Sequence, residues 1–210
     1  MITTRELAKD ALQELVMRDA FIWRLPPGGG CALTFDDGPN GKFTPQVLDL
    51  LASLGVSASF FLVGQAVLRN PAIARRIVEE GHAVGSHTFS HREFPGLSAQ
   101  ELADELYQGQ AAIRDVVGID TAIVRPPRGR VDIKSMWRAK RLGFRIVHWS
   151  KTYSDYQQDG REPLVARMRS RGLEAGDIVL LHDNNPYTIE ALGDALPEWL
   201  AEGKRFVTLL

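Results

Sequence analysis

The sequence has few features of a secreted or membrane-embedded protein. Cys31 is the single cysteine among 210 residues, so no internal disulfide can form and a disulfide-stapled scaffold is excluded. No apolar run approaches the roughly 18 residues that a membrane-spanning helix needs. The first residues lack the basic head and apolar core of a signal peptide, and we therefore expect a cytoplasmic location.

The sequence also has almost no excess of charge of either sign. Lys and Arg total 25 against 26 Asp and Glu, which gives a net charge of −1. A nucleic-acid-binding surface usually needs a basic excess, so we expect no nucleic-acid partner. Apolar residues make up 44% and charged residues 24% of the chain, as in ordinary soluble globular proteins. The length suits one domain, and we expect it to span residues 1–210.

We expect residues 1–30 to add a helical extension to this domain. Apolar side chains recur there at helical spacing: Leu7, Ala8, Ala11, Leu12, Leu15 and Val16. A helix packed on the domain is the favoured interpretation. A helix on a membrane surface is the alternative, because Phe21, Ile22 and Trp23 follow it and would suit peripheral membrane contact.

After Gly30, short apolar runs alternate with longer periodic stretches. The expected strands are 32–35, 57–62, 83–86, 122–124, 144–148, 178–181 and 206–208. The expected helices are 44–54, 71–80, 99–117, 132–142, 161–171 and 188–202. A glycine directly follows each of these helices, where a left-handed residue commonly ends a helix. This alternation predicts an α/β fold with a mainly parallel sheet, either open and doubly wound or closed into a barrel.

Two helix starts have recognisable signals. Ser98 and Glu101 have the spacing of a capping box ahead of the helix at 99–117. Asn70 precedes Pro71, and we expect an N-cap residue followed by proline at the first helical position.

Two adjacent carboxylates, Asp36 and Asp37, follow the first expected strand and precede Gly38-Pro39. In a continuing strand they would point to opposite faces of the sheet. Glycine and proline favour a turn here, so both carboxylates could address one point beyond the strand end. Taken alone, an ordinary turn in which aspartates bond their own backbone is the simpler interpretation.

Two histidines, His87 and His91, follow the third expected strand. At a separation of four residues they could project from one side of a helical turn towards a metal ion. Taken alone, such a pair more often lies on the surface without a metal. A carboxylate from Asp36 or Asp37 would complete an Asp-His-His set that suits a hydrolytic zinc site.

Arg125 and His182 also fall at the carboxyl ends of expected strands. A barrel places catalytic residues at that end of many strands, whereas an open sheet gathers its ligands near one switch point. Because Asp36, His87, Arg125 and His182 come from four separate strands, we favour the barrel.

The ordered motifs resemble those of the polysaccharide deacetylase family, also called the NodB-homology or carbohydrate esterase family 4 domain. They are TFDDGP at 34–39, HTFSH at 87–91, RPPRG at 125–129 and LLH at 180–182, and the resemblance covers about residues 31–183. It implies a distorted (β/α) barrel with about seven parallel strands.

The resemblance also implies a role for each motif residue. Asp37, His87 and His91 would hold one divalent metal ion, with zinc expected and cobalt, nickel or iron as alternatives. Asp36 would be the catalytic base, His182 the catalytic acid, Arg125 the residue that orients the base, and Asp155 the support of the acid. Leu180 would line the pocket for the acyl methyl group.

Three positions depart from the family pattern. Arg128 stands where an aromatic residue is usual, Tyr156 replaces a tryptophan, and Ser86 replaces an asparagine. None of them is a proposed ligand, base or acid. We still expect Arg128 and Tyr156 to contact substrate, and a guanidinium group there suits a substrate that carries phosphate or carboxylate.

The resulting hypothesis is a metal-dependent hydrolase that removes an N-acetyl group from an amino sugar or acetylated glycan, with metal-activated water as the nucleophile. An alternative enzyme is a deformylase or deacetylase of a lipid- or nucleotide-linked amino sugar, which a membrane-docked amino terminus would serve. An alternative from another class is a non-catalytic carbohydrate-binding protein that kept the fold.

Overall fold

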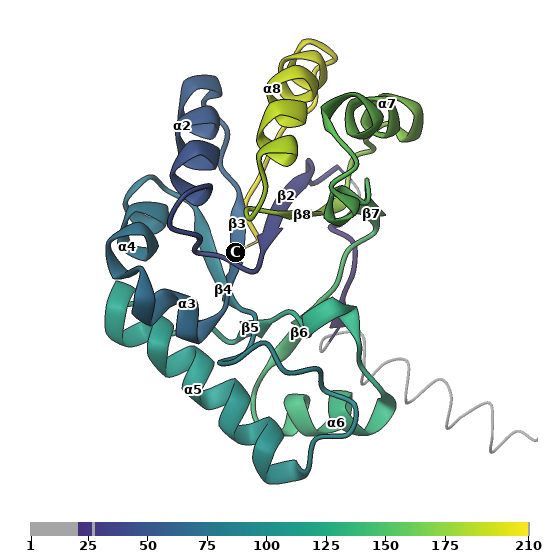
Figure 1. The fold of residues 1–210 in the computed structure, drawn as a ribbon. Helices are drawn as coiled ribbons and strands as arrows, with labels where there is room; N and C mark the ends of the chain where they lie inside the picture. Colours follow the sequence, from purple (N-terminus) through teal and green to yellow (C-terminus); the bar gives the residue numbers. More distant parts are fainter. Residues whose placement is uncertain (1–20, 27, 210) are drawn as a thin grey trace, which may run out of the picture.

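The computed structural model describes residues 21–26 and 28–209, and its centre is one parallel β-sheet. The strand order is β1-β6-β5-β4-β3-β2-β8-β7, and each neighbouring pair is parallel. The sheet curls into a half-barrel with the helices on its outer side (Figure 1). This confirms the expected α/β architecture.

The strands are short, as is usual where βα units repeat. They are β1 (Phe21–Ile22), β2 (Ala32–Asp36), β3 (Ser59–Leu62), β4 (Ala83–Ser86), β5 (Ile123–Val124), β6 (Arg145–Val147), β7 (Lys151–Thr152) and β8 (Ile178–His182). The α-helices are α2 (Thr44–Leu54), α3 (Gly64–Arg69), α4 (Pro71–Glu79), α5 (Ala99–Val117), α6 (Ile133–Arg141), α7 (Arg161–Arg171) and α8 (Pro186–Ala201). Two 3₁₀ turns, η1 (Pro127–Gly129) and η2 (Asp155–Gln157), follow β5 and β7.

Six of the seven expected strands are present, and the seventh is wrong. Residues 206–208 form no strand, because Phe206 makes only an isolated bridge to Cys31. The bridge does not extend along β2, because β3 pairs with this edge of β2 from Thr34 onward, starting at Ser59. The two-residue strands β1 and β7 bring the described total to eight.

The helix-start predictions have different outcomes. Ser98 and Glu101 form the complete capping box at α5. Asn70 and Pro71 begin α4 as expected, but the Asn70 side chain does not cap the helix. Its amide instead donates to the carbonyls of Pro39 and Ala66, because Asn70 also closes α3. Of the expected helical extension over residues 1–30, residues 1–20 lie outside the described residues, and Phe21–Ile22 form β1.

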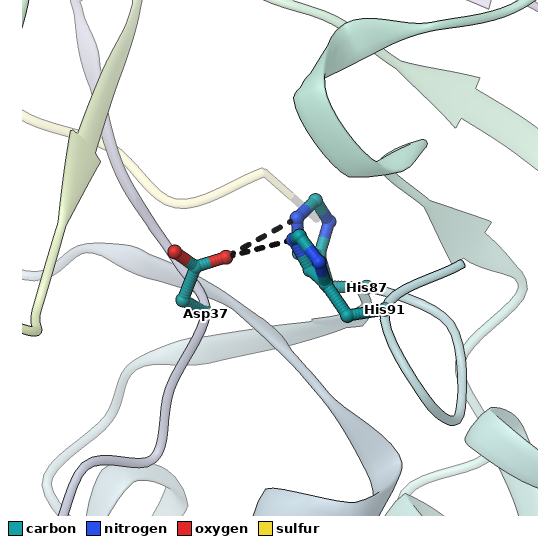
Figure 2. Close-up of side chains that lie close together, drawn as sticks. All are labelled: Asp37, His87 and His91. Carbon is teal, nitrogen blue, oxygen red and sulfur yellow. Dashed lines mark ion pairs between the residues drawn. The ribbon is translucent and has the colours of Figure 1, made fainter. Parts of the chain in front are cut away.

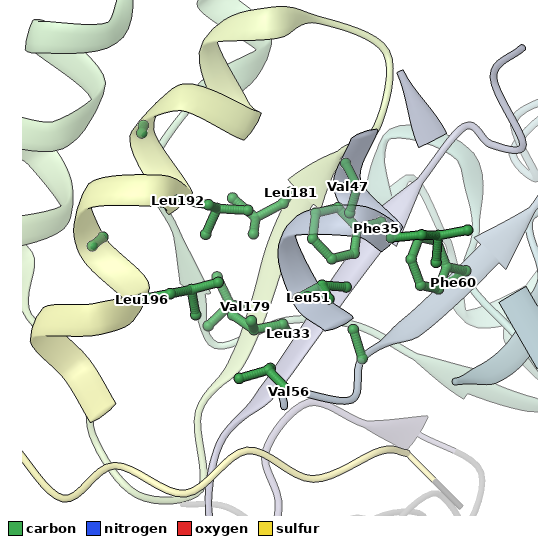
Figure 3. Packing of buried hydrophobic residues seen from close by; sticks show 14 of the residues in the cluster. Leu33, Phe35, Val47, Leu51, Val56, Phe60, Val179, Leu181, Leu192 and Leu196 are labelled. Carbon is green, nitrogen blue, oxygen red and sulfur yellow. The ribbon is translucent and has the colours of Figure 1, made fainter. Parts of the chain in front are cut away.

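The outer face of β2 packs into a hydrophobic core, whereas its inner face carries Thr34 and Asp36. Leu33 and Phe35 of β2 lie in the buried cluster with residues of β8, α2 and α8 (Figure 3). Alternate side chains of a strand point to opposite faces, so Thr34 and Asp36 point to the inner side of the curve. The register pairs Asp36 with His182, which places the functional ends of β2 and β8 side by side. In the described parts of the chain, no helix is both long and apolar enough to cross a membrane.

Candidate active site

Asp36 is ionically paired with Arg125 inside the half-barrel. Nη1 of the buried Arg125 lies 2.7 Å from Oδ1 of Asp36 and donates to Thr34 Oγ1 at 2.6 Å. Its remaining nitrogens donate to the backbone carbonyls of Val147 and His148, at 3.3 and 3.0 Å. The guanidinium group is thus bonded on every nitrogen, and a buried charge needs such partners.

Asp37, His87 and His91 gather their donor atoms at one point (Figure 2). Oδ1 of Asp37 lies 3.6 Å from Nε2 of His87 and 3.1 Å from Nε2 of His91. Asp37 and His91 both have positive φ angles, 76° and 63°. The left-handed turn after β2 brings both adjacent aspartates to His87, since Asp36 Oδ2 also lies 3.8 Å from its Nε2. The expectation that Gly38-Pro39 forces a turn is therefore confirmed.

The segment between the two histidines is a loop, and not the helical turn that the i, i+4 spacing suggested. A buried carboxylate, Glu105 of α5, holds this loop. It accepts hydrogen bonds from the backbone N–H groups of Phe89 (3.1 Å) and Ser90 (2.8 Å) and from the Ser90 hydroxyl. Tertiary anchoring, rather than helical spacing, therefore positions His91.

Two residues that the sequence reasoning missed support the side chains that are expected to hold the metal. Glu105 has no motif of its own, and only its place in the middle of an otherwise amphipathic helix hints at burial. Asn184 donates from Nδ2 to Oδ2 of Asp37 at 3.1 Å, which leaves Oδ1 of Asp37 facing the histidines. Outer partners of this kind orient metal ligands in proteins generally.

His182 is held by Asp155. Nδ1 of His182 lies 3.0 Å from Oδ1 of Asp155, and the backbone N–H of His182 donates to Oδ2 at 2.7 Å. Oδ2 also accepts from the Thr188 hydroxyl at 3.0 Å, so the buried carboxylate is well satisfied. The contact orients the His182 ring and leaves its Nε2 as the nitrogen not used by Asp155.

The site shifts the pKa values of its groups in opposite directions. Burial alone would lower the pKa of His182, but the hydrogen bond and negative charge of Asp155, with Asp36 and Asp37 nearby, raise it to about 9. Burial opposes ionisation of Asp37, yet its hydrogen bond with His91 and the surrounding histidines lower its pKa to about 2. Burial also lowers the pKa of His87, which favours its neutral form.

One cavity of about 560 Å³ connects these groups. Its wall includes Leu180, Arg128 and Tyr156 as well as the Asp36, Asp37, His87, His91 and His182 side chains. Arg125 and Asp155 lie behind Asp36 and His182. The structure therefore brings together the side chains that the motifs singled out. Trp149 and Asn184 also line the cavity.

Arg128 lies at the rim of the cavity. It has a positive φ of 55° inside η1, and its side chain is 73% exposed. Nη1 of Arg128 and Nη1 of Arg130 lie 3.1 and 3.0 Å from the two oxygens of Glu93. One carboxylate thus faces two guanidinium groups, and the rim keeps a surplus positive charge.

The Asp37, His87 and His91 donors fit a divalent metal ion. Their donor atoms lie within 4.8 Å of one another, and two imidazoles with one carboxylate are a usual set for zinc. Nδ1 of His87 lies 2.7 Å from the carbonyl oxygen of Arg125. A carbonyl can only accept, so Nδ1 carries the proton and Nε2 keeps its lone pair for an ion.

A family model described as polysaccharide deacetylase matches residues 8–147. The chain belongs to the polysaccharide deacetylase family. The matched residues include Asp37, His87 and His91, and the half-barrel fold is the one that solved members of the family share.

Several relatives in the polysaccharide deacetylase family carry functional names. A peptidoglycan-N-acetylglucosamine deacetylase of Bacillus cereus is 37% identical over 203 residues, which cover 94% of each chain. The peptidoglycan-N-acetylmuramic acid deacetylase PdaA of Bacillus subtilis is 33% identical over 84% of this chain and 68% of its own. A crystal structure of a peptidoglycan N-acetylglucosamine deacetylase with 4-naphthalen-1-yl-N-oxidanyl-benzamide superposes with a TM-score of 0.86 at 29% identity, covering 93% of this chain and 94% of the other.

Proposed function

We propose that this chain is a metal-dependent hydrolase that removes an N-acetyl group from an amino sugar of a glycan. The observation that carries the proposal is one cavity in which a metal-ligand set, a carboxylate paired with arginine and a histidine paired with aspartate all converge. Amide hydrolysis needs all three: a site for the metal ion, a general base and a general acid. The deacetylase names of the relatives support the same reaction class.

Asp37, His87 and His91 would hold the ion. A divalent ion there polarises an amide carbonyl and lowers the pKa of water towards ~7. The backbone N–H near Arg128 would help to stabilise the negative oxygen that develops on the carbonyl. Leu180, which lines the cavity, would contact the acyl methyl group.

Asp36 is the proposed general base. It lies at the bottom of the cavity with Oδ2 turned towards His87 and Oδ1 held by Arg125. The guanidinium group occupies Oδ1, so Oδ2 is the oxygen that can accept a proton from water. Arg125 therefore fixes which oxygen of the base is available.

His182 is the proposed general acid. Because its pKa is raised to about 9, the ring is protonated at neutral pH and can donate to the departing amine. Asp155 fixes the ring and stabilises the imidazolium form. The two proton-transfer groups thus belong to two separate ion pairs whose partners face away from the cavity.

The surplus charge at the rim supports a narrower substrate class. Arg128 lines the cavity, and N-acetylmuramic acid, named for the Bacillus subtilis relative, carries a carboxylate on its lactyl group. A guanidinium group pairs well with a carboxylate. We therefore propose that Arg128 contacts a carboxylate of the bound glycan.

Acetate release tests the main proposal. The zinc-loaded protein is incubated with N-acetylated chitotetraose and with a peptide-free glycan of alternating N-acetylglucosamine and N-acetylmuramic acid, and acetate and formate are quantified. We expect acetate, its loss after chelation and its return with zinc. Undiminished release from the chelated protein would exclude a metal-dependent reaction.

Arg128→Tyr tests the narrower class, and Arg130→Tyr is its matched control because both arginines pair with Glu93 but only Arg128 lines the cavity. We expect Arg128→Tyr to raise KM for the N-acetylmuramic acid glycan and to leave KM for chitotetraose nearly unchanged. Equal effects on the two substrates would remove the carboxylate contact from the proposal.

A further inference from the structure

A second recess of about 290 Å³ adjoins the metal-ligand set on the side of α3. Its wall includes Val63, Gln65, Ala66 and Arg69, and it shares Asp37 and His91 with the main cavity. The two recesses therefore meet at the metal ligands. A glycan bound with one sugar in the main cavity has a path into this recess for the adjoining sugar.

Gln65 and Arg69 supply the polar groups of the recess. They are four residues apart on α3, so their side chains lie on one face of the helix. Both side chains are exposed, and neither makes a hydrogen bond or ion pair with the described residues. Many of the other arginines of the described chain are held by a carboxylate or a carbonyl. Arg69 instead presents an uncompensated positive charge beside the ligands.

The backbone fixes this face relative to the metal ligands. The N–H groups of Gly64 and Gln65 donate to the carbonyls of Thr88 and Phe89, at 3.0 and 2.9 Å, in the loop between the two histidine ligands. The Phe89 ring lies so close to Gly64 that an added Cβ would sit 2.7 Å from it, so only glycine allows this approach. Arg69 is therefore carried by a short helix bonded directly to the metal-ligand loop.

We propose that this recess binds the carboxylate of a sugar next to the N-acetylated sugar, through the guanidinium group of Arg69 and the side-chain amide of Gln65. The proposal rests on the proposed glycan deacetylase function. An arginine fork and an amide N–H match the two oxygens of a carboxylate. A phosphate dianion would be repelled by the nearby Asp37 carboxylate, and Arg69 is the one cation, among the described residues that line the recess, that could offset this repulsion. A carboxylate, which carries a single negative charge, is therefore the better match.

The apolar part of the wall fits the same ligand. Val63 and Ala66 are buried apart from the surface that they give to the recess. A pyranose ring has a face of C–H groups, which such a surface can cover while the carboxylate reaches Arg69. The recess thus offers an apolar floor and a charged end, as small-ligand sites usually do.

Binding to the metal-free protein tests this site without turnover. The probes are the peptide-free tetrasaccharide of alternating N-acetylglucosamine and N-acetylmuramic acid, its lactyl methyl ester, and N-acetylated chitotetraose. Arg69→Met keeps the aliphatic stem and removes the charge. Arg75→Met is the matched control, because Arg75 is exposed on the next helix and has no ion-pair partner in the described residues.

We expect Arg69→Met to weaken binding of the acid roughly 5- to 30-fold and to leave Kd for the ester and chitotetraose within about twofold. Arg75→Met should change none of the three. An equal loss of affinity for the acid and the ester, or no loss of affinity for the acid, would overturn the proposed site. A hyaluronan tetrasaccharide, whose carboxylates belong to uronic acid, distinguishes the source of the carboxylate. If Arg69→Met also weakens its binding, the recess accepts any sugar carboxylate. If only binding of the lactyl probe is weakened, the recess is specific for the muramic acid group.

Kinetics separate this site from the proposed function. If the wild-type protein releases acetate but Arg69→Met leaves KM for the acid unchanged, the recess proposal fails alone. If no acetate appears with any glycan while Arg69→Met still weakens the acid selectively, the deacetylase proposal fails and the binding site stands. A double-mutant cycle with Arg128→Tyr should be additive, because the two arginines would hold different carboxylates.

Discussion

The backbone carbonyl of Arg125 accepts a hydrogen bond from Nδ1 of His87, while the side chain of the same arginine binds Asp36. Arg125, which directly follows β5, therefore sets the tautomer of a proposed metal ligand and the orientation of the proposed base. The first contact uses only the main chain and survives substitution of the side chain. The second does not. This difference allows the two roles to be measured separately.

Arg125→Met should reduce stability far more than metal affinity. The variant leaves the Asp36 carboxylate buried without its cation, which costs about 3–5 kcal/mol in comparable buried pairs. Urea unfolding measures the stability, and cobalt titration of the folded protein measures the affinity, which should stay within about threefold. Adding Asp36→Asn should recover part of the lost stability. A single variant as stable as the wild type would contradict the pairing.

Glu105→Ala should weaken metal binding although Glu105 touches no ion. It removes the acceptor that holds the loop carrying His91, and outer partners of this kind contribute about 10–100-fold to metal affinity. Glu105→Gln should restore most of the affinity, because an amide oxygen accepts the same two N–H bonds. Asp104→Ala, an exposed change on the same helix, is the control. Zinc affinity by competition with a chromophoric chelator measures all three.

The rate of deacetylation should fall as the pH rises through about 9. The proposed acid His182 must be protonated, and its pKa is raised to about 9 chiefly by Asp155 against the opposing effect of burial. Asp155→Asn removes that support, so the alkaline limb of kcat should move to lower pH. The pH profile of kcat for the two proteins measures this. An unmoved alkaline limb would show that His182 does not set it.

Asp183→Asn should change how stability depends on pH. Burial raises the pKa of Asp183 to about 7, well above the ~3.9 of an unfolded aspartate. The folded protein then binds this proton more tightly than the unfolded chain, so the contribution of Asp183 to stability is greatest below pH ~4 and declines as the pH rises through 7. The variant should lack this decline. Urea unfolding at pH 5 and pH 9 gives the difference between the two proteins.

Much of the fold could be predicted because its signals are local. The apolar runs located six strands, and the glycine after each long helix ended it where the structure does, as at Gly55 and Gly118. The elements that were missed are too short for any periodicity. β1 and β7 have two residues each, and α3 has six with glycine at its first position.

The candidate site was predictable in its members but not in its geometry. The motif residues line one cavity or support its walls, as their order along the chain indicated. Glu105 and Asn184 act through contacts between distant segments, and no local pattern marks them. The i, i+4 spacing of the two histidines even suggested the wrong local structure, because the loop takes its shape from α5 rather than from its own sequence.

The anchoring of the three ligands has a consequence for ion exchange. Asp37 is held by Asn184, His87 by a carbonyl, and the segment before His91 by Glu105, and none of these bonds involves an ion. These hydrogen bonds would therefore position the three side chains in the same way for any bound ion. Zinc, cobalt and nickel would then share one set of positioned ligands, so differences in turnover between them would report the chemistry of each ion.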